Sequence, residues 1–263
     1  MIVQHLIPLG AKIRNQQING VSIDDIHELK TVLAEYGVLV FKNQKCTNRD
    51  FVEFLKKFGQ LTFTTGETPV DDAPDLNMVS NVGRVEKPVS RYHVDSSYFK
   101  TPPAYSALKA AVLPEHGGET LFLNQYKSFE TLPDNLKTAL YRKNLKHRVT
   151  RLEIKDKTNH ETEALHPVFK KHPISGKIAI YMSTPQRCGD VNGINLDDSH
   201  KLVEDLYRHC IECQEPYRHR WEKNDIVMWD NGCTLHRADH SKVNGDRILY
   251  RGMSLGYNAS LNA

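Results

Sequence analysis

Several features are scarce in this sequence of 263 residues, and each absence excludes a class of protein. No apolar stretch approaches the roughly 18 residues that a membrane-spanning helix needs, which excludes insertion into a membrane. The five cysteines are an odd number scattered along a long chain, which argues against a disulfide framework and predicts free thiols. Lysine and arginine number 35 against 32 for aspartate and glutamate, and the basic residues form no stripe, so no nucleic-acid partner is expected.

The sequence also lacks a repeat of fixed period and any low-complexity tract. Its first residues lack the basic start and long apolar stretch of a secretory signal, and we therefore expect a cytoplasmic protein. A hydrophobic content of 39% and a charged content of 25% are typical of a globular protein. A chain of this length forms one large domain or two modest ones, and we favour a single domain over residues 1–263.

Local patterns predict helices that decorate a β core. Ser22 and Thr47 are predicted to begin helices, and Gly37 to end the first of them. Residues 65–92 are rich in turn formers with weak periodicity, which predicts a loop beside an active site. The remaining patterns predict helices around residues 128–143 and 200–213, and strands over residues 38–41, 105–113, 120–124, 177–182, 226–229 and 248–255. Helices that interrupt a succession of short strands indicate a mainly β fold with a double-stranded β-helix core, the jelly roll of cupin-like proteins.

One group of residues carries metal chemistry. On an extended segment residues i and i+2 project from the same face, so His93 and Asp95 can converge on one ion. His236 lies 143 positions further along, and folding would have to bring two strands together to join it to the pair. Two imidazoles and one carboxylate are the ligand set of a non-haem Fe(II) oxygenase, and they leave coordination positions open for a bidentate co-substrate and dioxygen.

Five segments together resemble a known family. In order and spacing they are similar to the taurine and 2,4-dichlorophenoxyacetate dioxygenases, which use Fe(II) and 2-oxoglutarate, and the likeness extends from the first helix to about Gly256. The segments are residues 92–98, residues 114–120 with Gly117-Gly118-Glu119-Thr120, residues 166–169, residues 229–231 with 236–238, and residues 245–251.

The resemblance implies roles for individual residues. His93, Asp95 and His236 would bind Fe(II) and form the catalytic centre. Arg247 would bind the distal carboxylate of 2-oxoglutarate with help from the hydroxyl of Thr120. A guanidinium suits that task because its planar fork bonds both carboxylate oxygens and stays charged when it is desolvated. Related halogenating enzymes replace the carboxylate ligand by a small residue, so the retained Asp95 favours hydroxylation.

The substrate is predicted less directly. By resemblance Arg251 would bind an anionic group of a small-molecule substrate, with an ion pair to a neighbouring acid as the alternative, and Tyr98 would line the pocket. The family's anion-binding histidine falls near Thr64, which disfavours taurine itself. Charged residues that include Glu67 indicate a zwitterion such as an amino-acid derivative. Members of the family are often dimeric or tetrameric, so a homo-oligomer is expected.

The expected reaction consumes 2-oxoglutarate and O2, releases succinate and CO2, and oxidises a substrate C–H bond. One alternative is a zinc hydrolase that uses the same three ligands. Another is a catalytically silent β-barrel that binds 2-oxoglutarate.

Other cysteines and histidines have simpler interpretations. Cys210 and Cys213 lack the second ligand pair of a structural zinc site and are interpreted as helix residues. His160, His166 and His172 are expected to be solvated or to lie in turns.

Overall fold

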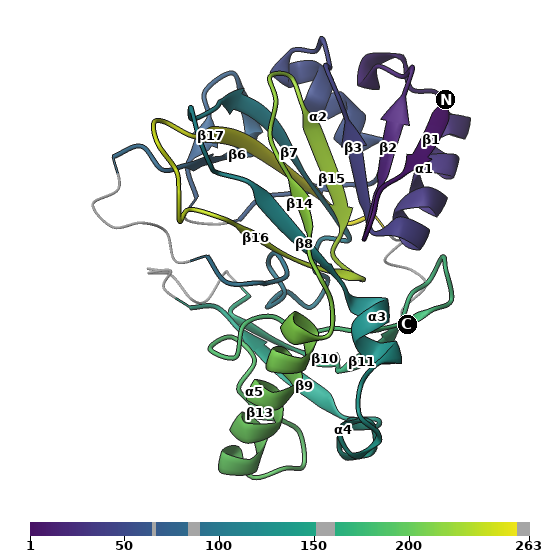
Figure 1. Ribbon diagram of the computed structural model, residues 1–263, viewed down its shortest axis with the longest axis vertical. Coiled ribbons are helices and arrows are strands. Elements are labelled where there is room, and N and C mark those ends of the chain that lie inside the picture. The colour runs from purple at the N-terminus through teal and green to yellow at the C-terminus, as the bar shows by residue number, and fades with distance from the viewer. Residues whose placement is uncertain (65–66, 84–89, 151–160, 257–263) are drawn as a thin grey trace.

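The computed structural model describes residues 1–64, 67–83, 90–150 and 161–256 (Figure 1). A sheet of nine strands faces a smaller sheet of three, and all strand pairs in them are antiparallel except β2 with β3. The large sheet contains β1 (Ile2–His5), β2 (Ala11–Arg14), β3 (Val38–Phe41), β15 (Ile226–Asp230), β7 (Tyr105–Val112), β17 (Ile248–Ser254), β6 (Ala73–Ser80) and β5 (Pro69–Val70), with β4 (Leu61–Thr62) paired to β17. The small sheet contains β14 (Tyr217–His219), β8 (Thr120–Asn124) and β16 (Thr234–Ala238). This double-sheet core confirms the predicted jelly roll.

A hydrophobic layer fills the space between the two sheets. Phe122 of β8 contacts Trp229 of β15 with ring centroids 5.5 Å apart, and Leu108 and Leu249 belong to the same cluster. Successive residues of β3 alternate between this layer and the opposite face of the large sheet, which helices cover. All four residues of β3 are therefore buried, which explains why its sequence is a short apolar run without polar alternation.

Two capped helices cover the outer face of the large sheet. Helix α1 (Ile23–Tyr36) follows the short 3-10 helix η1 (Ile18–Gly20), begins at a capping box made by Ser22 with Asp25, and ends at the left-handed Gly37. Helix α2 (Asn48–Lys56) begins at a second capping box of the same kind at Thr47. Both predicted helix starts are confirmed, because caps of this type satisfy free amide groups locally and leave a mark in the sequence.

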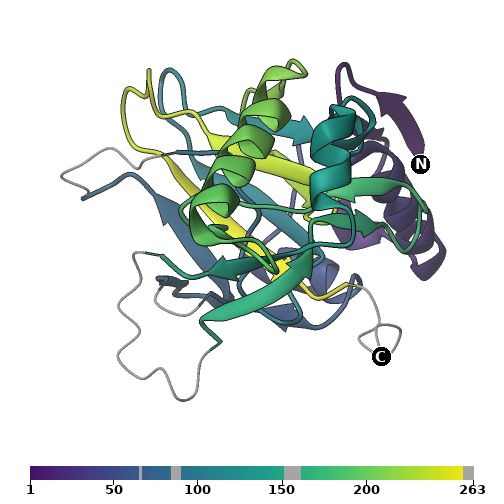
Figure 2. The same ribbon diagram turned by 90° about the horizontal axis from the view of Figure 1, so that it is seen from below.

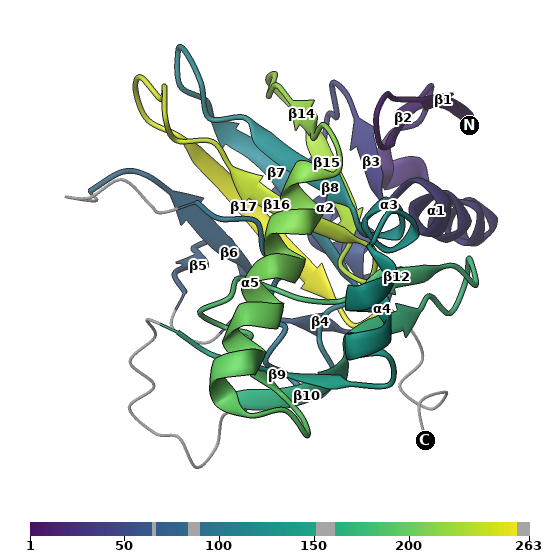
Figure 3. The same ribbon diagram turned by 60° about the horizontal axis from the view of Figure 1, so that its bottom comes forward.

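An insert between β8 and β14 forms a second hydrophobic core on the outer face of the small sheet. It contains α3 (Gln125–Glu130), α4 (Asp134–Leu140), α5 (Leu196–Glu212) and the strands β9 (Asn144–Arg148), β10 (Glu163–Pro167), β11 (Phe169–Lys171), β12 (Ile178–Ile180) and β13 (Asp190–Val191). Helix α5 lies across the small sheet on the side away from the large one (Figures 2 and 3). The single helix predicted around residues 128–143 is wrong, because Pro133 separates α3 from α4.

The predicted loop over residues 65–92 is also partly wrong. Strands β5 and β6 occupy much of it, and β6 pairs with β17 at the border of the large sheet. Proline is tolerated on such peripheral strands, and Pro69 and Pro74 hid the strands from sequence analysis. Residues 65–66 and 84–89 lie outside the described residues.

Within the part of the chain that the structure describes, none of the helices combines the length and the apolar character needed to cross a bilayer.

Candidate active site

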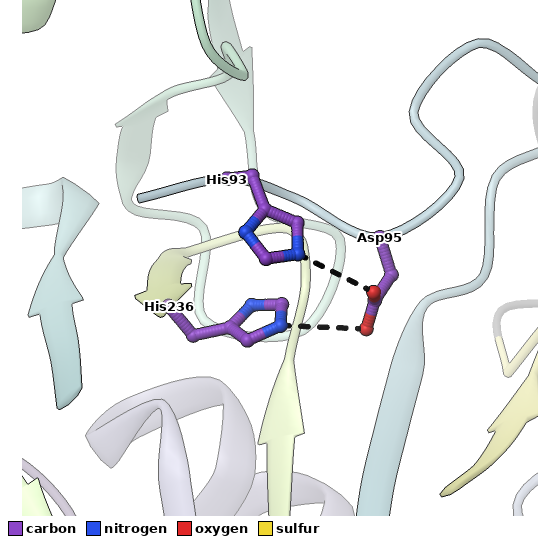
Figure 4. Close-up of side chains that lie close together, drawn as sticks. All are labelled: His93, Asp95 and His236. Carbon is purple, nitrogen blue, oxygen red and sulfur yellow. Dashed lines mark ion pairs between the residues drawn. The ribbon is translucent and has the colours of Figure 1, made fainter. Parts of the chain in front are cut away.

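His93, Asp95 and His236 converge at one end of the layer between the sheets. Their ligand atoms all lie within 4.8 Å of one another, with Nε2 of His93 3.8 Å and Nε2 of His236 3.7 Å from the two carboxylate oxygens (Figure 4). The backbones of the two histidines form an isolated bridge, through N–H···O bonds of 2.9 and 3.0 Å. This bridge joins the distant segments. His93 lies in this isolated bridge and Asp95 begins a turn, so the two residues do not lie on the extended strand that was predicted.

Protonation states at the site suit metal binding. Nδ1 of His93 lies 2.9 Å from the carbonyl oxygen of Arg91, which can only accept, so the proton resides on Nδ1 and Nε2 offers its lone pair. Burial lowers the pKa of both imidazoles, that of His236 to about 3. Burial alone would raise the pKa of Asp95, but the charge of Arg251 and a hydrogen bond from Ser106 hold it well below its usual range. Two neutral imidazoles and an ionised carboxylate are the states that bind a divalent metal, so these residues fit an Fe(II) ion.

Arg247 lies directly before β17 and is almost completely buried between the sheets. Its Nε donates to the carbonyl oxygen of Gly118 at 2.9 Å, and Nη2 donates to Oγ1 of Thr120 at 3.4 Å. Among the residues that the structure describes, no carboxylate forms an ion pair with this guanidinium, and burial lowers its pKa to about 10. A buried cation without a counter-charge is costly, and an anionic ligand would offset that cost.

Gly118 shapes the position of Arg247. Its φ is +77°, and a Cβ at this residue would lie 2.9 Å from Cδ and 3.0 Å from Nε of Arg247. The Gly-Gly-x-Thr motif thus admits the guanidinium on one side and supplies the Thr120 hydroxyl on the other. That hydroxyl also accepts a bond of 3.0 Å from the indole of Trp221, a residue that no sequence motif had indicated.

Arg251 extends from β17 toward the metal ligands. Nη1 donates to Oδ1 of Asp95 at 2.9 Å, and Nη2 lies 3.4 Å from Oγ1 of Thr64 and 3.7 Å from Oε1 of Glu67. The ion pair that the sequence left open as an alternative is therefore present, and it involves two acids. Tyr98 is buried nearby, and burial raises its pKa while Ser96, Arg187 and Arg251 act to lower it.

Polar side chains outside the predicted site also contact these groups. The hydroxyl of Ser106 donates to Oδ2 of Asp95 at 2.8 Å, and Asn231 donates to Ser106. The only sequence signal for Ser106 was a polar residue in a largely apolar strand. Two of the histidines that were expected to be solvated or to lie in turns are buried: His166 faces the carbonyl oxygen of Phe99, and His172 lies 3.0 Å from Asp230.

Cys210 lies in α5 and Cys213 at its end, both as free thiols, which confirms their interpretation as helix residues. His172 accepts two backbone N–H groups at Nδ1 and therefore also stabilises a turn, as predicted for this group. His160 lies outside the described residues.

Comparison with known proteins places this geometry in a family. The sequence model of the family described as taurine catabolism dioxygenase TauD, TfdA family matches residues 4–253 of this chain. The chain is 28% identical over 258 residues to an alpha-ketoglutarate-dependent 2,4-dichlorophenoxyacetate dioxygenase of Cupriavidus pinatubonensis, covering 88% of each chain. It is 25% identical over 262 residues to an alpha-ketoglutarate-dependent sulfate ester dioxygenase of Pseudomonas putida, covering 92% of this chain and 85% of the other.

A solved structure agrees with both sequence matches. A taurine dioxygenase from Burkholderia xenovorans superposes with a TM-score of 0.83 at 25% identity, covering 97% of this chain and 91% of that one. The family model spans nearly the whole chain, and it includes the three metal-ligand candidates as well as Arg247. The protein therefore belongs to the TauD, TfdA family of Fe(II)/2-oxoglutarate-dependent dioxygenases.

Proposed function

We propose that His93, Asp95 and His236 bind Fe(II) for the oxidation of a C–H bond in a small acidic molecule. The observation that carries the proposal is the meeting of two neutral imidazoles and one carboxylate within 4.8 Å, in a fold that also buries a guanidinium without a partner acid among the described residues. Bound Fe(II) supplies the redox chemistry that couples decarboxylation of 2-oxoglutarate by O2 to substrate hydroxylation, with succinate and CO2 as co-products.

Arg247 and Thr120 would bind the distal carboxylate of 2-oxoglutarate. The Thr120 hydroxyl accepts bonds from Trp221 and Arg247, so its single proton is left for a further acceptor such as a carboxylate oxygen. Arg247 would contribute a charge-assisted bond in a site shielded from water, where such bonds are strong. Together they would hold the acid end of 2-oxoglutarate and direct its keto-acid end toward the metal ligands.

Neither alternative function is supported. A zinc hydrolase would use the same three ligands but would give no purpose to the buried Arg247, and the family matches are dioxygenases. A silent binding protein would not need the complete ligand set that the chain retains.

The substrate proposal rests on the charges beside the metal ligands. Arg251 would bind an acid group and Tyr98 would line the pocket. The names of three similar proteins state a substrate, which is an aryloxyacetate, a sulfate ester or taurine. Each of these compounds bears an acid group. Glu67 lies 3.7 Å from Arg251 and would repel a simple anion, so a substrate that pairs an ammonium with Glu67 and an acid with Arg251 fits best. A zwitterion is the class that we propose.

Succinate formation tests the reaction and the substrate class together. Purified enzyme with Fe(II), 2-oxoglutarate and O2 would be screened against matched pairs of acids with and without an amino group. We expect substrate-dependent succinate release, greatest for a zwitterion, and none from His93→Ala. Release that persists in His93→Ala would contradict the proposed metal site, whereas equal rates for both members of each pair would contradict only the zwitterion.

We also propose that residues 1–263 form a single domain. Strand β8 supports this proposal, because Phe122 belongs to the core between the sheets while Leu121 and Leu123 belong to the core of the insert. The cytoplasmic location and the homo-oligomer stay predictions.

A further inference from the structure

A buried chain of hydrogen bonds ends on the carboxylate of Asp95. The indole Nε1 of Trp229 donates to Oδ1 of Asn231 at 3.1 Å, and Nδ2 of Asn231 donates to the hydroxyl of Ser106 at 2.8 Å. Ser106 then donates to Oδ2 of Asp95 at 2.8 Å. All four residues are at most 3% exposed, so water does not compete for these bonds.

The chemistry of the groups gives this chain one direction. An indole N–H can only donate, so the oxygen of the Asn231 amide must face Trp229 and its NH2 group must face Ser106. Ser106 accepts that bond, and its single proton is left to point at Asp95. A hydrogen bond to an ionised acceptor is stronger than one between neutral groups, so the chain ends with its strongest bond on the carboxylate.

The position of Ser106 is unusual for a polar residue. It lies on β7 in the middle of the large sheet, directly opposite Trp229 on β15 and Met253 on β17. A hydroxyl buried among apolar side chains is costly unless it is hydrogen-bonded. Ser254 on the same sheet is equally buried, yet its hydroxyl has no hydrogen-bond partner among the described residues. The two serines therefore differ in their link to Asp95.

Both oxygens of Asp95 are held from the side of the large sheet. Ser106 binds Oδ2 and Arg251 binds Oδ1, so the rotamer that directs the carboxylate at His93 and His236 is fixed by two donors. A substrate that engages Arg251 would leave the Ser106 bond as the restraint that does not depend on substrate.

We propose that Ser106, oriented by Asn231 and Trp229, is a positioning residue that keeps Asp95 turned toward the metal. The Trp-Asp-Asn motif would thereby contribute to metal affinity through two of its side chains, although neither forms a hydrogen bond with Asp95 itself. The role depends on the proposed function, because Ser106 can act on the metal only if Asp95 is a ligand. Replacing a residue that forms a hydrogen bond with a metal-ligating side chain typically weakens metal binding by about 10- to 100-fold.

The test measures the dissociation constant of Mn(II), a probe that needs no turnover, from the electron paramagnetic resonance signal of the free ion. Ser106→Ala should raise the dissociation constant by about 10- to 100-fold, and Ser106→Thr, which keeps the hydroxyl, should restore most of the affinity. Asn231→Leu keeps the side-chain size but removes the amide, and it should cause a smaller loss. Ser254→Ala, the matched control, should bind Mn(II) like the wild type.

The outcomes separate this role from the proposed function. If the wild-type protein binds no Mn(II), both fail. If it binds Mn(II) and Ser106→Ala binds equally well, or if Ser106→Thr fails to restore affinity, the positioning role alone is overturned. Thermal unfolding of each variant identifies one that does not fold, and Asn231→Leu then decides the matter, because unchanged Mn(II) affinity in it would also overturn the role.

Discussion

Replacing Arg247 by methionine should change ligand affinity and stability by very different amounts. Methionine has a similar length and no charge, so the variant loses the charge-assisted bonds to 2-oxoglutarate. Removing one partner of a buried charge pair costs about 2–5 kcal/mol of binding free energy. The dissociation constant for 2-oxoglutarate should therefore rise by roughly 30-fold to several-thousandfold. The free protein should lose little stability, because the buried guanidinium has bonds to Gly118 and Thr120 but no partner acid among the described residues.

The magnitudes decide between this role and a purely structural one. The two hydrogen bonds from the charged guanidinium contribute about 1.5–3 kcal/mol each, and relief from desolvation of the cation, which costs several kcal/mol, offsets most of their loss. A structural ion pair broken in the same way would instead cost about 3–5 kcal/mol. Calorimetric titration with 2-oxoglutarate in the presence of Mn(II), together with urea unfolding of the free protein, measures both quantities.

A matched variant sharpens the comparison. Arg247→Lys keeps the charge but not the planar fork, and its affinity for 2-oxoglutarate should lie between those of the wild type and Arg247→Met. In wild-type protein, ligand at a hundred times its dissociation constant should add about 2.7 kcal/mol to the free energy of unfolding, and the same concentration should add less than about 1 kcal/mol to Arg247→Met. Unchanged 2-oxoglutarate affinity in Arg247→Met, or a large loss of stability in the free variant, would refute the reasoning.

Three further predictions address other parts of the site and the fold. Gly118→Ala should weaken 2-oxoglutarate binding because its Cβ would meet Arg247, whereas Gly83→Ala has a similar positive φ with nothing within 4 Å and should leave binding unchanged in the same titration. Burial lowers the pKa of His147 to about 3, compared with about 6.5 in the unfolded chain. The unfolded state therefore binds a proton first as the pH falls, and the free energy of unfolding should drop by roughly 2 kcal/mol between pH 6.5 and pH 5 through this residue. Urea unfolding of His147→Phe should show a shallower loss between these pH values; an unchanged slope would contradict this. Glu67→Gln should reduce the preference for zwitterions over simple acids in succinate assays, and an unaltered preference would remove Glu67 from substrate recognition.

The sequence predicted best where chemistry restricts the residue types at a position. The ligand set of a non-haem Fe(II) oxygenase is two imidazoles and one carboxylate, so His93, Asp95 and His236 could be recognised as candidates by type and spacing, and the structure brings them together. Helix starts at Ser22 and Thr47 were predictable because a cap acts within three residues of itself.

Prediction failed where a residue's role depends on distant neighbours. Strand β6 is stabilised by β17, more than 160 positions away, and its own sequence shows little alternation. Ser106 acquires its partners only when β7 lies beside β15, and nothing local distinguishes it from a serine tolerated in a strand. The pairing of Arg251 with Glu67 likewise joins segments that are far apart in the chain. The candidate ligands could be predicted from the sequence, while the residues that contact them could be found only from the fold.

We propose that one site binds both a metal, through His93, Asp95 and His236, and 2-oxoglutarate, through Arg247. The most direct measurement is an anaerobic visible spectrum of the protein with Fe(II) and 2-oxoglutarate added singly and together. A weak charge-transfer band that requires both additions, and that is lost in His236→Ala, is the predicted result. No band with wild-type protein, together with no binding of either addition, would contradict the claim.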